Sequence, residues 1–234
     1  MTMLQVRNIE TYIQEFHILQ GVEFDVPEQE VTVLLGRNGA GKTTTMRSMM
    51  GLNPATKGEI LFQGESIREL PPHVIAKKGI GYVPEDQDIF SDLTVQENLR
   101  VAKRKENEKT EKREKWILEL FPDLKIAYTR KGGNLSGGQK QMLSIARALV
   151  NETPLLLIDE PSKGLAPIMV DKVMEALNVI KQTTTVLLVE QNFRMASKMG
   201  ERFYILDEGR TVHHGQMRQL EEDKELRQKY LGIA

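Results

Sequence analysis

The stretch that decides the fold is residues 36–43, which read Gly36-Arg37-Asn38-Gly39-Ala40-Gly41-Lys42-Thr43. It matches the pattern G-x-x-x-x-G-K-[ST], whose glycines let the backbone turn tightly and point its N–H groups inward at phosphate oxygens. A nearly continuous apolar strand, residues 31–35, precedes this loop. Residues 41–50 are expected to form a helix whose N-terminus adds positive partial charge. Strand, loop and helix in this order predict a nucleotide-binding site.

The residue types of this phosphate loop predict roles at bound ATP. Lys42 is expected to reach the β- and γ-phosphates, and the Thr43 hydroxyl is expected to bind Mg²⁺. The backbone of residues 36–44, which extends the loop to Thr44, is expected to hold the phosphates. ATP and Mg²⁺ are therefore the expected cofactors.

A second motif joins an apolar strand to two acids at its carboxyl end. Residues 155–158 are Leu-Leu-Leu-Ile, and Asp159 and Glu160 follow. Ligands of such sheets lie at the carboxyl ends of the strands. Asp159 is therefore expected to hold Mg²⁺, directly or through water. Glu160 leaves the strand in another direction and is placed to polarise a water that attacks the γ-phosphate. The alternative is an acidic turn after a buried strand, and the phosphate loop argues against it.

A third motif opens a helix expected over residues 136–150, and it reads Leu135-Ser136-Gly137-Gly138-Gln139. Ser136 is a good N-cap by type. Two glycines in a first helical turn cost about 1 kcal/mol each relative to alanine, which suggests that another group approaches the backbone closely. Exposed amides and a hydroxyl suit a γ-phosphate. Both phosphate readers can serve one ATP only across two facing copies, so the motif indirectly predicts a dimer. A capped helix after a loop is the alternative.

The remaining apolar patterns predict an α/β fold. Strands are expected at residues 4–9, 22–26, 58–62, 80–83 and 184–189, a hairpin at 203–206 and 211–214, and helices at 72–78, within 94–121 and at 167–180. Because buried strands alternate with helices, the central sheet should be largely parallel.

Composition and charge bear on the size of the domain, on a nucleic-acid partner, on cysteine-based sites and on a membrane span. The 234 residues fit one domain or a domain with a subdomain, and the net charge of −1 gives no electrostatic argument for a nucleic-acid partner. The charged run 103–115 mixes both signs and is interpreted as a solvated helix face or mobile loop. The absence of cysteine excludes disulfides and thiolate metal sites. No apolar run approaches the roughly 20 residues of a membrane helix, so any spanning must be done by another chain.

In order and spacing, the phosphate loop, residues 135–139 and residues 155–160 resemble the nucleotide-binding domains of ABC transporters, over essentially the whole chain. The Ser-Gly-Gly-Gln element is the specific part, because the other two motifs occur in many P-loop ATPases. The resemblance implies one ATP-binding domain over residues 1–234. This domain would have a mostly parallel core sheet, an N-terminal antiparallel β subdomain and a helical subdomain at about residues 87–135.

The resemblance also implies partners. Two copies, or one copy and a paralogous ATPase, would form a head-to-tail dimer around two ATP molecules. Each ATP would touch Lys42 of one subunit and Ser136 and Gly138 of the other. Closure on ATP would drive integral membrane permease subunits, which the helical subdomain would contact. The chain would lie peripherally on the cytoplasmic face of the cell membrane, with an extracytoplasmic substrate-binding protein as an indirect partner and no role for nucleic acid.

Further segments narrow the resemblance to the ATPases of branched-chain amino acid importers and the related urea importers. They are Glu160-Pro161-Ser162-Lys163-Gly164-Leu165-Ala166-Pro167, Val189-Glu190-Gln191-Asn192 and Tyr230-Leu231-Gly232. The segments 34–39 and 161–165 lean to the urea side. Uptake of branched-chain amino acids is the implied function, and uptake of urea or an amide is the alternative.

The chain departs from the general ABC pattern at four positions. Gln191 stands at the usual switch histidine, and its amide can hydrogen-bond a γ-phosphate but cannot carry a proton. Glu85 aligns with the usual glutamine and could still contact Mg²⁺ or the attacking water, with Gln87 as a less favoured substitute. Ala166 replaces the usual aspartate of the inter-subunit loop.

The fourth departure concerns adenine. The usual stacking aromatic aligns with Ile13, and the adjacent Tyr12 either stacks instead or is only a strand side chain. We nevertheless expect an active ATPase with Lys42, Glu160 and Gln191 as catalytic residues. The rivals are a soluble ABC protein of DNA repair or translation, for whose insertions the chain has no room, and a non-hydrolysing, ATP-gated interaction module.

Overall fold

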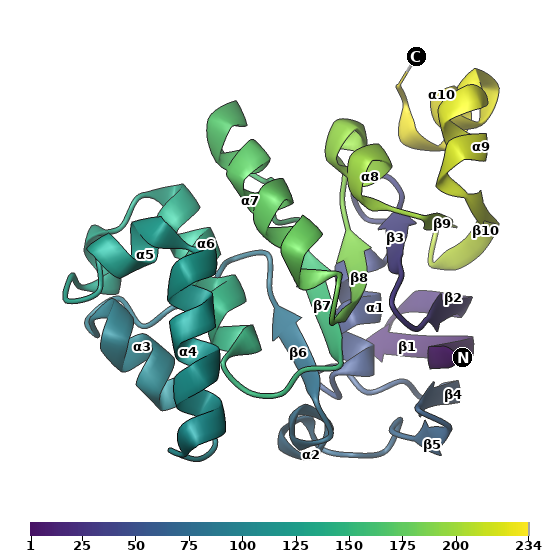
Figure 1. Ribbon diagram of the computed structural model, residues 1–234. Helices are drawn as coiled ribbons and strands as arrows, with labels where there is room; N and C mark the ends of the chain where they lie inside the picture. Colours follow the sequence, from purple (N-terminus) through teal and green to yellow (C-terminus); the bar gives the residue numbers. More distant parts are fainter. Residues whose placement is uncertain (234) are drawn as a thin grey trace.

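The structure, a computed structural model that describes residues 1–233, contains two β-sheets with helices around them (Figure 1). Its strands are β1 (Thr2–Ile13), β2 (Phe16–Pro27), β3 (Val31–Leu35), β4 (Lys57–Phe62), β5 (Glu65–Ser66), β6 (Ile80–Val83), β7 (Leu155–Asp159), β8 (Thr185–Val189), β9 (Arg202–Asp207) and β10 (Arg210–Gln216). Its helices are α1 (Lys42–Met49), α2 (Pro72–Lys77), α3 (Val95–Ala102), α4 (Glu108–Leu120), α5 (Pro122–Ile126), the 3₁₀ helix η1 (Gly132–Asn134), α6 (Gly137–Leu149), α7 (Pro167–Ile180), α8 (Phe193–Met199), α9 (Met217–Glu222) and α10 (Lys224–Leu231).

The strand pairings confirm a mostly parallel core sheet beside an antiparallel N-terminal sheet. The core sheet has the order β10-β9-β3-β8-β7-β6, and only its β9–β10 hairpin is antiparallel. The other sheet has the order β2-β1-β4-β5 with antiparallel pairings. The first two strands run longer than predicted, because β1 and β2 pair, with several shifts of register, as far as Ile13 and Phe16 at the hairpin turn.

The central strands of the core sheet, β3, β8 and β7, are buried on both faces, as their apolar runs predict. In β7, Leu156 and Ile158 pack into a core with the helices, while Leu155 and Leu157 face a second core shared with α1 and the N-terminal sheet. Alternate side chains of a strand point to opposite faces, so an uninterrupted apolar run is what two covered faces require. Because β8 pairs in parallel with both β3 and β7, the carboxyl ends of the three strands lie at the same edge of the sheet.

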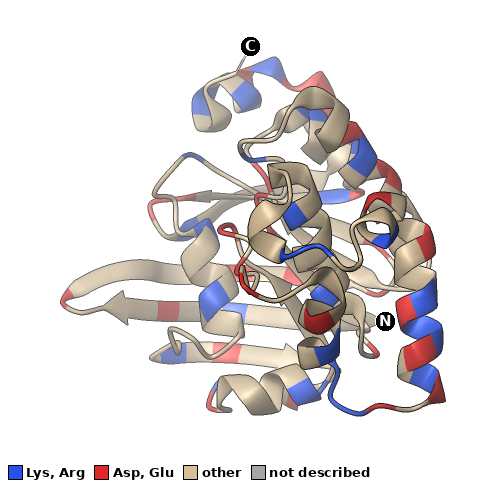
Figure 2. Cartoon of the chain, turned by 90° about the vertical axis from the view of Figure 1, so that its left-hand side faces the viewer, with Lys and Arg blue, Asp and Glu red and all other residues tan. Residues whose placement is uncertain are grey.

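Residues 87–135 form a group of short helices to one side of the core sheet, at the left of Figure 1. Thr94 and Asn107 each cap a helix with a reciprocal side-chain box, which explains where α3 and α4 begin. Basic and acidic residues alternate along the helix at the right of Figure 2. In residues 1–233, no helix is both long and apolar enough to cross a membrane.

Candidate functional site

The phosphate loop joins β3 to α1 in the strained backbone that its glycines predict. Gly36, Gly39 and Gly41 have φ angles of 150°, 82° and 101°. A Cβ atom added at Gly36 would overlap the backbone carbonyl of Leu206, whereas one added at Gly39 would meet no atom within 4 Å. The loop is therefore fixed against β9 on one side and open on the other, where a ligand can approach its backbone.

Lys42 lies under this loop with its ammonium group directed at the centre. The side chain is buried, and Nζ donates to the carbonyls of Gly36 at 2.9 Å and Arg37 at 3.1 Å. It also lies 3.7 Å from Oε1 of Glu160. Burial lowers the pKa of Lys42, and the charge of Glu160 opposes that shift. The lysine is thus a partly desolvated cation, which binds a phosphate more strongly than a hydrated one.

Asp159 ends β7 as a buried carboxylate, and neither of its oxygens has a well-formed hydrogen bond among the described residues. Burial raises the pKa of Asp159 to about 6, and the hydroxyl of Thr43 in the phosphate loop opposes that rise. Such a group is costly unless a cation satisfies it. No cluster of three or more histidine or acidic side chains forms a metal site within residues 1–233. This arrangement fits Mg²⁺, which typically uses one or two protein ligands together with substrate phosphates.

Glu160 turns away from the strand that Asp159 ends. Its φ of 46° lies in the left-handed region, which is rare for a residue with a side chain and clusters at functional sites. Gln191 joins this carboxylate to the phosphate loop, because its Nε2 lies 2.5 Å from Oε1 of Glu160 and 2.5 Å from Oδ1 of Asn38. The carboxyl ends of β7 and β8 and the phosphate loop therefore meet at one point.

Lys42, Glu160 and Gln191 line one cavity of about 400 Å³, which we call the phosphate-loop pocket, whereas the buried Asp159 is not among its lining residues. Its lining residues are Ile18, Asn38, Gly39, Gly41, Lys42, Thr43, Thr44, Glu85, Glu160, Lys163 and Gln191. Sequence reasoning assigned no role to Ile18 or Lys163. Lys163 follows Glu160 by three residues, so its position in the same turn was the available signal.

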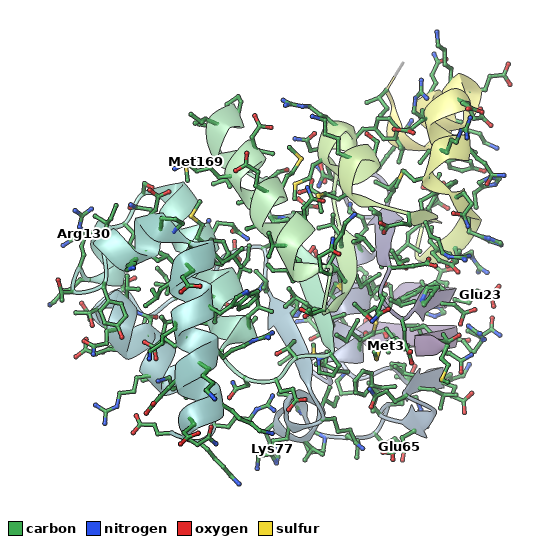
Figure 3. All side chains as sticks on the ribbon, viewed as in Figure 1. Met3, Glu23, Glu65, Lys77, Arg130 and Met169 are labelled. Atoms are coloured by element: carbon green, nitrogen blue, oxygen red, sulfur yellow. The ribbon has the colours of Figure 1, made fainter. Side chains whose placement is uncertain are left out.

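The segment Ser136–Gln139 does not line this pocket. Ser136 caps α6 as predicted, because its Oγ accepts from the Gln139 N–H at 3.3 Å, and the Gln139 side chain accepts from the Ser136 N–H at 3.0 Å. The two glycines between Ser136 and Gln139 have different surroundings. A Cβ atom at Gly138 would overlap the side chain of Met169 on α7 (Figure 3), whereas one at Gly137 would meet only Leu165, at 3.8 Å. Packing against Met169 therefore explains why residue 138 is a glycine. The backbone at Gly137 stays open to the approach of another group.

The side chains of two residues that were predicted to contact the nucleotide, Tyr12 and Arg37, contact other residues of the chain. The Tyr12 ring stacks on His17, with centroids 4.2 Å apart, at the end of the β1–β2 hairpin and outside the pocket lining. Adenine stacking on Tyr12 therefore stays a prediction. The Arg37 side chain donates to the carbonyl of Lys229 at 3.1 Å, so only its backbone belongs to the phosphate loop.

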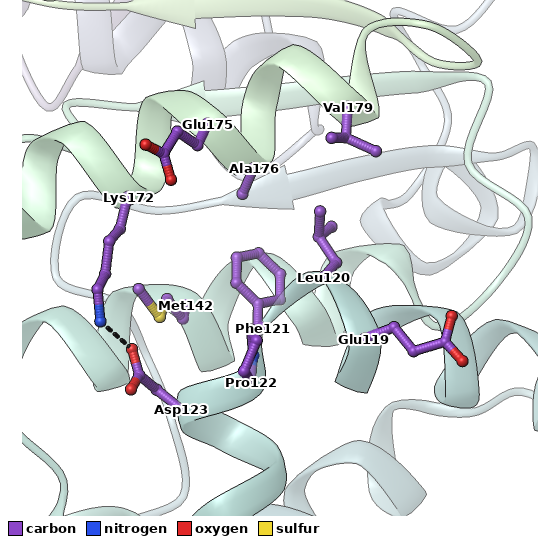
Figure 4. Close-up of a pocket in the computed structure, with 10 residues that line it drawn as sticks. All are labelled: Glu119, Leu120, Phe121, Pro122, Asp123, Met142, Lys172, Glu175, Ala176 and Val179. Atoms are coloured by element: carbon purple, nitrogen blue, oxygen red, sulfur yellow. Dashed lines mark hydrogen bonds and ion pairs between the residues drawn. The ribbon is translucent and has the colours of Figure 1, made fainter.

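A second cavity of about 400 Å³ lies between α7 and the junction of α4 and α5 (Figure 4). Lys172 of α7 and Asp123 of α5 pair across it at 2.6 Å, and Phe121 is among its lining residues. It contains neither a glycine-rich loop nor a strand carboxyl end. We therefore place the candidate site at the phosphate-loop pocket.

Glu190, the residue before Gln191, holds two loops of the site together. Its buried carboxylate accepts hydrogen bonds from the N–H and Oγ of Ser162, at 3.0 and 2.9 Å. It also accepts from the N–H groups of Gln191 and Asn192, at 3.1 and 3.0 Å. Burial raises the pKa of Glu190, and these hydrogen bonds oppose the rise. The turn after Glu160 is thereby tied to the turn that carries Gln191.

Replacing Glu190 with alanine should lower the free energy of unfolding by about 2–4 kcal/mol, because it removes the buried acceptor of four partly buried hydrogen bonds. Urea denaturation measures this loss. Glu111 is exposed on α4, and Glu111→Ala serves as the control, with an expected change within about 0.5 kcal/mol. Equal stability of the two variants would contradict the bridging role.

Comparison with known proteins gives full-length relatives. The family model described as ABC transporter matches residues 19–163. The high-affinity branched-chain amino acid transport ATP-binding protein BraG of Pseudomonas aeruginosa is 39% identical over 98% of this chain and 100% of its own length. The lipopolysaccharide export system ATP-binding protein LptB of Escherichia coli K12 is 33% identical, over 99% and 98%. Among solved structures, the dimeric post-hydrolysis ATP-binding cassette MJ0796, bound to ADP and phosphate, is similar with a TM-score of 0.81 and 28% identity, over 92% of this chain and 99% of that one.

Proposed function

Since this chain belongs to the ABC transporter family and is an ATPase whose hydrolysis is coupled to transport, we propose that it powers the uptake of branched-chain amino acids through membrane permeases. The similarity to BraG over both full lengths supports this substrate class. LptB, at 33% identity, serves lipopolysaccharide export, so family membership alone does not select the cargo. Uptake of urea or an amide is the alternative that residues 161–165 favour.

One observation carries the ATPase chemistry, namely the convergence of Lys42, Glu160 and Gln191 in the phosphate-loop pocket. Lys42 binds the β- and γ-phosphates. Glu160 orients the attacking water and accepts its proton. Of the two N–H groups of the Gln191 amide, one holds this carboxylate, and the other would leave Asn38 to donate to the γ-phosphate. Because Gln191 carries no charge, the proton must be accepted by Glu160.

Thr43 and Asp159 are the residues that would hold Mg²⁺. The orphaned carboxylate of Asp159 at the end of β7 supports this assignment. Bound Mg²⁺ would neutralise the charge that develops on the phosphate oxygens. The ion pair of Glu85 with Lys163 makes Glu85 a less available ligand than Asp159.

We further propose that residues 1–234 form one ATP-binding domain, with a helical subdomain at about residues 87–135 that contacts the permeases. Two copies, or one copy and a paralogue, would form a dimer in which Ser136–Gln139 of one subunit meets ATP bound by the other. The dimeric form of MJ0796 supports this assembly, as does the separation of Ser136–Gln139 from the pocket of its own chain. Such a dimer would act at the cytoplasmic face of the membrane, below an extracytoplasmic binding protein.

Reconstitution tests the transport assignment. The chain is purified from its native membrane with the permeases that accompany it, placed in proteoliposomes with ATP at its own side, and supplied with the cognate binding protein. Labelled leucine should accumulate at least tenfold over a Glu160→Gln assembly, and labelled urea should not. Accumulation of urea instead would select the alternative. Permeases without a binding protein, and movement of lipid out of the ATP-bearing leaflet, would contradict import.

A further inference from the structure

An ion pair that sequence reasoning did not anticipate stands in the wall of the phosphate-loop pocket. Nζ of Lys163 contacts Oε1 of Glu85, and both residues line the pocket with Glu160 and Gln191. Glu85 comes from the turn after β6, and Lys163 from the turn after the neighbouring strand β7. The two residues are 78 positions apart in the chain and meet because their strands pair.

The position of Lys163 is fixed relative to the proposed base. Its backbone N–H donates to the carbonyl of Glu160 at 3.1 Å, so the lysine belongs to the same tight turn as that residue. Its side chain lines the pocket together with Glu160 and Gln191, the residues proposed to face the γ-phosphate. The pKa of Lys163 is raised, chiefly by its hydrogen bond to Glu85, so the ammonium group stays charged.

The charges that line the pocket would be unbalanced without this lysine. The charged lining residues are two cations, Lys42 and Lys163, and two acids, Glu85 and Glu160. Without Lys163, the unpaired carboxylate of Glu85 would face an incoming triphosphate, and like charges a few ångströms apart repel strongly even when partly solvated. Stability is a weak reason for the pair, because the Lys163 side chain is 61% exposed and exposed ion pairs contribute little.

We propose that Lys163 is a nucleotide-binding residue of this ATPase, whose ammonium group neutralises Glu85 and so permits a carboxylate beside the γ-phosphate. This inference rests on the proposed ATPase function and deepens it. Glu85 and Lys163 act as one unit, so that loss of the lysine is harmful only while the glutamate is present. The effect falls on the triphosphate rather than the diphosphate, because ADP lacks the phosphate that faces Glu85.

Equilibrium binding of a non-hydrolysable ATP analogue and of ADP, with Mg²⁺, tests the proposal on the purified full chain. Lys163→Met should raise the Kd for the ATP analogue about tenfold and the Kd for ADP no more than about twofold. The double variant Lys163→Met/Glu85→Gln should return the Kd for the ATP analogue to within about threefold of the wild type. Lys172→Met is the matched control, because it breaks another exposed lysine–acid pair, at 2.6 Å, in the cavity of Figure 4.

The possible results separate the role of Lys163 from the proposed ATPase function. An unchanged Kd in Lys163→Met, an equal loss for both nucleotides, or failure of Glu85→Gln to rescue binding would overturn the role of Lys163. If the wild type hydrolyses ATP in the same preparation, such a result leaves the ATPase function standing. If the wild type itself binds neither nucleotide, the proposed function fails, and the role of Lys163 fails with it. Thermal melting of each variant excludes unfolding as the cause.

Discussion

The Glu160→Gln protein should bind ATP with nearly wild-type affinity and hydrolyse it about 10²–10⁴-fold more slowly, as expected when a general base is removed. Glutamine has the same shape, and its amide oxygen can still accept from Gln191, which lies 2.5 Å from Oε1 of Glu160. What the substitution removes is the capacity to accept a proton from the attacking water. Phosphate release at saturating ATP measures the loss in kcat.

A matched control exists within the chain. Glu208 has the same left-handed φ of 46° as Glu160 but lies exposed in the β9–β10 turn. Glu208→Gln should therefore leave phosphate release unchanged, since it repeats the chemical change and the backbone conformation outside the pocket. Equal phosphate release from Glu160→Gln and the wild type would remove Glu160 from the mechanism. Absence of release from the wild type would favour the ATP-gated interaction module.

The Gly137→Ala protein should lose ATP hydrolysis by about 10²-fold or more while remaining at least as stable as the wild type. A Cβ atom at residue 137 would meet nothing in its own chain closer than Leu165, at 3.8 Å, so the folded subunit tolerates it. Alanine is also the better helix former at the start of α6. Activity is lost only if a ligand held by another subunit must approach this backbone closely.

Gly138→Ala separates packing from ligand approach. Its added Cβ would overlap Met169, so this variant should lose about 1–3 kcal/mol of stability as well as activity. Urea denaturation and phosphate release, measured on both variants, distinguish the two effects. Full activity in Gly137→Ala would mean that no triphosphate comes near this helix end.

Much of the fold was predictable, because burial leaves direct traces in the sequence. The run at residues 31–35 is apolar except at Thr32, the run at residues 155–158 is apolar at every position, and both strands are covered on both faces. The phosphate loop could be predicted from the sequence, because its tight backbone turn requires the glycines and the bound phosphates require Lys42. The longer limits of β1 and β2 were less predictable, since pairing extends strands past their apolar patterns.

The contacts missed by sequence reasoning are those that tertiary packing creates. Glu85 and Lys163 meet through the pairing of β6 with β7, and nothing local to either residue indicates the other. The cost of glycine at Gly138 was correctly noted, but its cause is Met169 of the same chain. The stacking of His17 on Tyr12 likewise arises only because the β1–β2 hairpin turns between them.

The claim that one subunit holds only half of each working site is tested most directly by mixing two inactive proteins. Lys42→Ala removes the cation of the phosphate loop and keeps Ser136–Gln139 intact. Gly137→Ala keeps the phosphate loop intact and blocks the approach of a ligand to Ser136–Gln139. In a mixed dimer, one of the two sites regains both intact halves, so an equal mixture should recover about one quarter of wild-type ATP hydrolysis. If the two proteins exchange subunits and the mixture still hydrolyses ATP no faster than either protein alone, the shared site is contradicted.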